Sequence, residues 1–292
     1  MADLTPNDPR VLACVDTSHF AEFVADYAAW AAQGMHLPLE FLHILDRHPE
    51  QGGSVTDRSG SLGVEPQEAL MERLVADEAA RSKAARERGR VLLSGLRDRA
   101  MARGVNSPSI RQRYGELEET LVEQEERVEL FVLGRRGENA ENTGRDLGRN
   151  LERVVRALKR PILAVTEAFV KPQRTLIAFD GGIVTRRGVE MIATSTLFRT
   201  LHCDIVMSGE ASRRGTEQLE KARDRLLHAG LSVEAVMLPG DPEREIAQAV
   251  RARGTDLLVM GAYGHSVLRR LFMGSRTSDL LRASTVPTLL LR

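Results

Sequence analysis

The chain has few of the features that mark secreted or nucleic-acid-binding proteins. Its 292 residues include two cysteines, Cys14 and Cys203, which lie in separate apolar, strand-like runs and cannot form a C-x-x-C pair. We therefore expect buried, reduced thiols, as in a cytoplasmic protein. Lysine plus arginine equals aspartate plus glutamate at 41 each, so no excess of positive charge indicates a nucleic acid as partner.

Long apolar runs are absent too. The longest, such as 257–260 and 288–291, have the length of a strand and fall far short of the roughly 18 residues that span a bilayer. The first residues contain neither a basic start nor an apolar signal core, so we expect no secretory signal, no membrane contact and a cytoplasmic location. The P-loop pattern GxxxxGK[ST] and the dinucleotide pattern GxGxxG are also missing.

Comparing the chain with itself reveals two copies of one unit. Three blocks recur in the same order: 10–18 matches 174–182, 129–137 matches 256–264, and 160–166 matches 286–292. A length of roughly 150 residues per domain also favours two domains. We predict a first domain at 1–170 and a second at 171–292, with a linker at 167–173.

The first copy is longer than the second. Asp16 and Asp180 are 164 positions apart (180 − 16), whereas Gly134 and Gly261 are 127 apart (261 − 134), so the first copy holds 37 extra residues between these blocks. Most of them fall at about 46–103. This stretch predicts a surface loop rich in Gly, Ser and charge, followed by a long amphipathic helix. A mobile flap is the alternative.

Short apolar strands alternate with helical patterns in each copy. In the second copy we predict strands at 175–180, 204–207, 232–238, 256–261 and 288–292, and helices at about 185–201, 217–229, 242–253 and 275–283. Apolar strands that are each followed by a helix are typical of a parallel sheet covered on both faces. The predicted fold class is α/β, with two tandem doubly wound domains, each with a five-stranded parallel sheet flanked by helices. A ligand is expected at the carboxyl ends of the strands.

Glycines follow the fourth strand of the second copy at a spacing that suits a phosphate. Gly261 and Gly264 are followed, after nine residues, by Gly274 and Ser275. Glycines allow backbone N–H groups to approach an anion, and Ser275 would begin a helix whose first N–H groups and dipole face the phosphates. A plain strand-exit turn and a plain helix cap would use the same residues, so the glycines alone leave both interpretations open.

This spacing, G-x-x-G, nine residues and then G-[ST], resembles the ATP-binding motif of the universal stress protein family. The resemblance covers both copies, including the aspartate that ends the first strand and the Pro-x-Leu pattern of the last strand. It implies ATP, with Mg²⁺, bound across the strand ends, and Asp180 near the nucleoside. The residues implied for ATP binding are Asp180, Gly240, Gly261, Gly264, Gly274, Ser275, Arg276 and Thr277. His265, directly after Gly264, could contact a phosphate or could equally be a solvated loop histidine. One departure is Gly182, where the family commonly has serine.

The first copy departs further from that motif. Ten residues separate Gly137 from Gly148, and Arg149 stands where the family has serine or threonine. A degenerate second site would consist of Asp16, Ile44, Gly134, Gly137 and Gly148. The arginines of this loop, Arg135 among them, could bind a phosphate by charge, although interspersed acidic residues favour a mixed surface loop. The Asp16-Thr-Ser18 segment, in contrast, keeps the family's nucleoside-side pattern better than the second copy does.

No nucleophile or general base stands out beside the glycine loop, so we name no catalytic residue and no metal ligand. Three functions are compatible with the sequence: an ATP-binding regulatory protein of a stress response, a slow ATP hydrolase or phosphotransferase, and a scaffold that has lost its ligand. Family members commonly pair through their last strands. The resemblance therefore implies that 162–166 and 288–291 pair as an intramolecular pseudo-dimer, and a further homodimer is an additional option.

Overall fold

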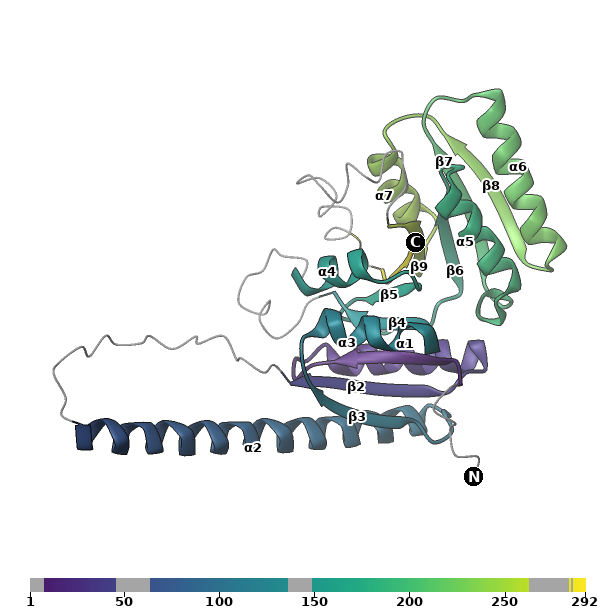
Figure 1. Cartoon of the computed structure of the whole chain (residues 1–292). Helices are drawn as coiled ribbons and strands as arrows, with labels where there is room; N and C mark the ends of the chain where they lie inside the picture. The colour runs from purple at the N-terminus through teal and green to yellow at the C-terminus, as the bar shows by residue number, and fades with distance from the viewer. Residues whose placement is uncertain (1–7, 46–63, 136–148, 263–283, 285) are drawn as a thin grey trace.

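The ten strands that the structure describes belong to one sheet, in the order β3-β2-β1-β4-β5-β10-β9-β6-β7-β8 (Figure 1). This computed structural model describes residues 8–45, 64–135, 149–262, 284 and 286–292, without the side chains of 64–72 and 149–150. The strands of the first half are β1 (Arg10–Val15), β2 (Leu39–Leu45), β3 (Ser109–Tyr114), β4 (Val128–Gly134) and β5 (Ile162–Val165). Those of the second half are β6 (Arg174–Ala178), β7 (His202–Ser208), β8 (Ser232–Leu238), β9 (Leu257–Gly261) and β10 (Thr288–Leu291).

Helices cover both faces of this sheet. Those of the first half are α1 (Ala21–Met35), α2 (Val64–Ala102), α3 (Leu117–Gln124) and α4 (Arg149–Ala157), and a 3₁₀ turn, η1 (Glu125–Arg127), precedes β4. Those of the second half are α5 (Ile183–Thr194), the 3₁₀ turn η3 (Thr196–Phe198), α6 (Arg213–His228) and α7 (Pro242–Ala252). One core packs α1, α2, α5 and α6 against the sheet, and the other core packs α3, α4 and α7 against the opposite face.

Alternation along the strands explains the two cores. In β1, Val11 and Ala13 contribute to the first core and Leu12 to the second, and all three are fully buried. A strand that is buried on both faces has to be apolar throughout, which is the pattern seen in the sequence. The predicted fold class, two doubly wound units of five parallel strands each, is therefore confirmed.

The two halves join at one antiparallel strand pair. β5 and β10 run side by side with Leu163 opposite Leu289, whereas the other strand pairs that the structure describes are parallel. The expected pairing of the last strands is thus present, and it turns two sheets into one. A second contact crosses the same junction: the Thr196 hydroxyl donates to the carbonyl of Gly34 at 2.5 Å. We call this junction the seam.

One predicted helix is interrupted. The sequence indicated a single helix at about 185–201, but α5 ends at Thr194 and the 3₁₀ turn η3 follows. Ser195 is extended, with φ −79° and ψ 130°, and its hydroxyl accepts a hydrogen bond from the N–H of Leu197. This side chain competes with the helix for a backbone donor, which explains the break. The helix predicted at 275–283 lies outside the described residues.

The long helix of the first copy is present as predicted. α2 has 39 residues, and its later part packs Leu93, Leu96 and Ala100 into the core beside α1. Figure 1 shows its earlier part running well past the edge of the sheet. In the part of the chain that the structure describes, no helix is long and apolar enough to cross a membrane.

Candidate functional site

The order in which the chain adds strands to the sheet changes direction between β6 and β9. β6 is followed by β7 on one side, and β9 lies on its other side, so the carboxyl ends of β6 and β9 flank a switch point where doubly wound proteins bind ligands. Ala178 pairs with Met260. Asp180 lies two residues after Ala178, and Gly261 lies one residue after Met260. The structure therefore brings these two predicted residues to the same edge of the sheet.

Asp180 is held in place by its own loop. Its Oδ1 accepts hydrogen bonds from the N–H of Gly182 at 2.8 Å and from the hydroxyl of Thr185 at 2.6 Å. Thr185 is 3% exposed and stands in the first turn of α5. Gly181 has a left-handed φ of +71°, which a residue with a Cβ rarely adopts. The loop therefore fixes the orientation of the carboxylate.

The sequence did not identify Thr185 as part of the site. A threonine at the start of a helix is usually explained as a cap or as part of the packing. Its position five residues after the aspartate is the only signal that was available, and it acquires meaning once α5 is seen to start beside the end of β6.

The first half builds the same loop with a different hydroxyl. Asp16 follows β1 at the matching position, and its Oδ1 accepts from the N–H of Ser18 at 3.1 Å and from the Ser18 hydroxyl. Ser18 corresponds to Gly182. A Cβ on Gly182 would lie 2.9 Å from Oδ1 of Asp180, so a serine there would require the carboxylate to shift. The hydroxyl that donates to the aspartate therefore comes from the loop residue Ser18 in the first half and from Thr185 of α5 in the second half.

Gly261 has a packing role in addition to its place at the edge. The sequence suggested a glycine that turns sharply, but Gly261 is the buried last residue of β9 and its φ is not left-handed. A Cβ there would lie 3.2 Å from Cγ1 of Val184. The absence of a side chain therefore lets the first turn of α5 approach β9 closely.

Gly240 lies at the same edge of the sheet, after β8. Its φ of +128° is left-handed, and the next residue, Asp241, caps α7 by accepting from the N–H groups of Glu243 at 3.1 Å and Arg244 at 3.3 Å. Pro242 occupies the first turn of α7. The N–H groups of a first turn have no partner within the helix, so the missing N–H of proline costs no helical hydrogen bond. The glycine thus makes the turn that directs the start of α7 to this edge.

At the matching edge of the first half, Arg135 is engaged with the second half. Gly134 ends β4, and Ile44 lies in β2 opposite Arg113. The guanidinium of Arg135 donates to the carbonyl of Ser284 at 2.5 Å and to the hydroxyl of Thr288 at 3.3 Å. The sequence left phosphate binding by the loop arginines open as the less favoured alternative to a mixed surface loop. For Arg135 the structure shows a structural role across the seam instead.

The remaining predicted residues lie outside the described part of the chain. They are Gly264, His265, Gly274, Ser275, Arg276 and Thr277 of the second half, and Gly137 and Gly148 of the first.

A charged cluster lies at the opposite edge, where β6 and β7 begin. Asp204 is fully buried and accepts from Arg174 at 2.6 Å and Arg253 at 2.8 Å. Burial raises the pKa of Asp204, but the hydrogen bonds and charges of the two arginines outweigh it, so the net pKa is lowered. His202 and Glu234 place ligand atoms near this carboxylate, with all three within 4.8 Å. Because the arginines already neutralise Asp204, the cluster is explained as a structural ion-pair network.

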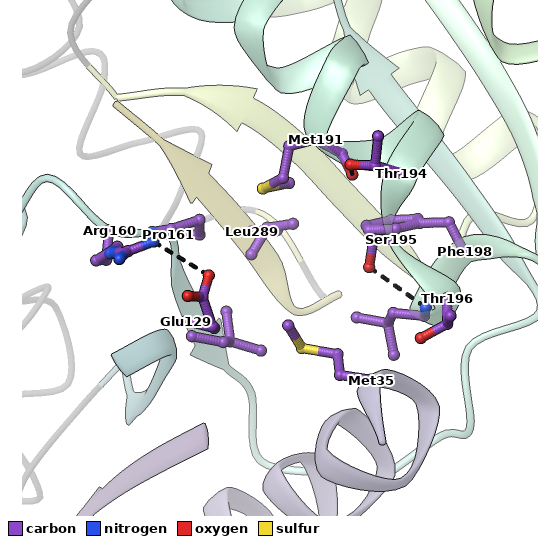
Figure 2. A pocket seen from close by; sticks show the side chains of 12 residues that line it. Met35, Glu129, Arg160, Pro161, Met191, Thr194, Ser195, Thr196, Phe198 and Leu289 are labelled. Carbon is purple, nitrogen blue, oxygen red and sulfur yellow. Dashed lines mark hydrogen bonds and ion pairs between the residues drawn. The ribbon is translucent and has the colours of Figure 1, made fainter. Parts of the chain in front are cut away.

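A pocket of about 370 Å³ lies at the seam (Figure 2). Apolar side chains from both halves line much of it, among them Met35, Met191 and Leu289. One side carries the ion pair of Arg160 with Glu129, at 3.1 Å. The pocket contains none of the predicted site residues.

The fold and its edges define a class: a tandem α/β protein whose two doubly wound units each present an aspartate at a switch point. The family model described as the universal stress protein family matches residues 9–166 and 198–292. The chain therefore belongs to the universal stress protein family.

Relatives of the whole chain and of one unit are both found. Universal stress protein Slr1230 of Synechocystis sp. is 30% identical over 285 residues, which cover 97% of this chain and 99% of that protein. A universal stress protein of Thermus aquaticus is 35% identical over 85 residues, covering 28% of this chain and 62% of its own length. A solved universal stress protein from Archaeoglobus fulgidus has the same fold, with a TM-score of 0.68, 14% identity and coverage of 98% of this chain and 97% of that one.

Proposed function

We propose that the second half binds ATP, together with Mg²⁺, at the carboxyl ends of β6 and β9. The observation that carries this proposal is Asp180, which the Thr185 hydroxyl and the Gly182 N–H hold at the switch point. Gly261 and Gly240 lie at the same edge of the sheet. The phosphates would be bound by Gly264, Gly274, Ser275 and Thr277, which match the family motif, and by the adjacent His265 and Arg276.

We further propose that the bound nucleotide acts as a regulator. Oδ1 of Asp180 already accepts two hydrogen bonds, one of them from a hydroxyl at 2.6 Å, which suits a residue that orients a ligand better than one that removes a proton. Occupancy of the site would then change the conformation or partner binding of the protein during stress. Slow ATP hydrolysis or phosphoryl transfer is the alternative, and turnover measurements distinguish the two.

The first half is proposed to bind ATP weakly or not at all. Its loop carries Arg149 in place of a hydroxyl residue, and it is one residue longer. Arg135, at the start of that loop, is held by Ser284 and Thr288 of the other half. This contact supports a role for the loop in joining the halves.

Titration of the full chain with Mg²⁺ and ATP in a calorimeter tests the proposal. We expect one strong site per chain, nucleotide in the purified protein, and negligible steady-state turnover. Replacing Gly261→Ala together with Ser275→Ala should abolish the site, with an unchanged circular dichroism spectrum. The matched control is Gly134→Ala in the first half, which should leave the affinity as it is. Two equal sites, or none, would contradict the proposal.

A second variant tests the asymmetry. Deleting one residue between Gly137 and Gly148 and changing Arg149→Ser restores the family spacing and its hydroxyl in the first half. The expected result is a second ATP site. A stoichiometry that stays at one, with the fold intact, would show that this loop is not what weakens the first half.

A further inference from the structure

Helix α2 is anchored to the protein through its later part. The Ser82 hydroxyl lies 2.9 Å from the hydroxyl of Tyr114, and Gly89 packs against His43. Further along, the guanidinium of Arg99 donates twice to the buried Asp26, at 2.7 and 2.9 Å. These contacts hold α2 from residue 82 onward.

Residues 73–81 of α2, the stretch before Ser82 whose side chains the structure describes, have no such support. Every residue from 73 to 81 is exposed, and these include two large apolar side chains, Leu74 at 54% and Val75 at 62% exposure. Figure 1 shows this part extending beyond the sheet. A helical segment without tertiary contacts is marginally stable in water, so a projecting segment of this kind gains stability from a partner.

The charge along α2 changes sign midway. Residues 64–80 contain five acidic residues and one arginine, a net charge of −4 (1 − 5). Residues 81–90 contain five basic residues and one glutamate, a net charge of +4 (5 − 1). Two such helices in parallel would place like charges together, whereas an antiparallel pair places the acidic part of each against the basic part of the other.

We propose that two copies of this protein dimerise through an antiparallel pairing of their α2 helices. In the register that places residue i opposite residue 158 − i, no charged residue of 64–94 faces one of like sign. Asp77 then faces Arg81 of the second copy, and Leu74 faces its Ala84. All four positions are exposed, and their spacing of three and four residues puts them on one stripe.

This stripe is free for a partner because the body of the protein contacts another side of α2. Consecutive helix residues are about 100° apart, since a turn has 3.6 residues. The stripe, which continues from Ala84 to the exposed Arg88, therefore lies roughly 100° around the helix from the stripe of Gly89, Leu93 and Leu96. The latter three face the body. The bodies of the two copies would lie at opposite ends of the helix pair.

Light scattering on the full-length protein tests the dimer. We expect a dimer at low ionic strength that dissociates as salt is added, because exposed charge pairs are screened. Asp77→Arg would put two arginines against each other twice per dimer, and Arg81→Asp would do the same with two aspartates. Each single change should weaken dimerisation by at least about tenfold.

Mixing the two variants gives the decisive result. In the heterodimer of Asp77→Arg with Arg81→Asp, both pairs between the two helices again join opposite charges. Each helix has the same sequence in the mixture as it has in its variant alone, so any recovery comes from the contacts between helices. The equimolar mixture should therefore recover the dimer. The matched control is Glu217→Arg, which breaks the exposed i,i+4 pair with Arg213 on α6 and should leave the dimer intact.

Three results would overturn the proposal. They are a monomeric wild-type protein at low salt and high micromolar concentration, a mixture that stays monomeric, and single variants that dimerise like the wild type. Circular dichroism on each variant distinguishes loss of pairing from loss of folding, since pairing variants keep the spectrum of the folded α/β body.

Discussion

Replacing Thr185 by valine tests whether a charge-assisted hydrogen bond holds Asp180. The hydroxyl donates to the carboxylate at 2.6 Å and the residue is 3% exposed, so water cannot easily replace it. Hydrogen bonds to charged groups contribute about 1.5–3 kcal/mol to stability. Valine has nearly the volume of threonine, so the change removes the donor without opening a cavity. We expect Thr185→Val to lower the free energy of unfolding by about 1.5–3 kcal/mol.

A second buried threonine supplies the matched control. Thr175 is fully buried, and its hydroxyl donates to the neutral carbonyl of Leu257 at 3.0 Å. Thr175→Val should therefore cost about 0.5–1.5 kcal/mol, the usual contribution of a neutral hydrogen bond. Because Thr175 stands near the start of β6, away from Asp180, this control should also leave ATP affinity unchanged. Thr185→Val should reduce ATP affinity, because the carboxylate of Asp180 loses the hydrogen bond that fixes its orientation.

Urea unfolding followed by circular dichroism, together with calorimetric titration of ATP, measures both effects. The first half suggests a rescue: Gly182→Ser combined with Thr185→Ala copies the Ser18 arrangement into the second half. This double variant should recover part of the stability that Thr185→Ala alone loses. Equal losses in Thr185→Val and Thr175→Val, with equal ATP affinity, would refute the reasoning.

Three further predictions follow from the described contacts. The pKa of Asp204 is lower in the folded protein than in the unfolded chain. Ionised Asp204 therefore stabilises the fold fully at pH values above its pKa in the unfolded chain, and this stabilisation is lost as the pH falls through its pKa in the folded protein. Asp204→Asn should cost about 3 kcal/mol at neutral pH, and urea unfolding should show this difference shrinking towards acid pH. Burial, and then the charges of Asp16 and Asp204, raise the pKa of the Cys14 and Cys203 thiols to about 12, so DTNB at pH 8 should react with them only after denaturation. The second half expressed from Arg174 leaves β10 without β5, so light scattering should show a dimer, and a stable monomer would argue against the seam as an obligatory contact.

The fold was accessible from the sequence because the strands are apolar throughout and recur in two copies. The predicted strand at 232–238 has the bounds of β8, and the predicted strand at 256–261 differs from β9 by one residue. The break after Thr194 was missed, because the choice between continuing a helix and capping a 3₁₀ turn with Ser195 depends on one local hydrogen bond. Hydrophobic periodicity is insensitive to such competition.

The site was accessible only in part. Asp180 and Gly261 were placed at the same edge by the topology that the repeat predicts. Thr185 was missed, since its role depends on where the first turn of α5 lies relative to Asp180. The contact of Arg135 with Ser284 joins residues 149 positions apart, and no local pattern indicates it. Periodicity likewise predicted the α2 helix but could not show that Leu74 would be 54% exposed among the described residues.

The antiparallel seam determines on which edges of the sheet the carboxyl ends of the two halves lie. Because β5 and β10 run in opposite directions while each half is internally parallel, the carboxyl ends of the two halves open on opposite edges of the sheet. A partner docked at the Asp180 edge would meet the amino ends of the first half's strands. The two units therefore face opposite ways, and ATP bound at the Asp180 edge, as proposed, would lie across the sheet from the carboxyl ends of the first unit's strands.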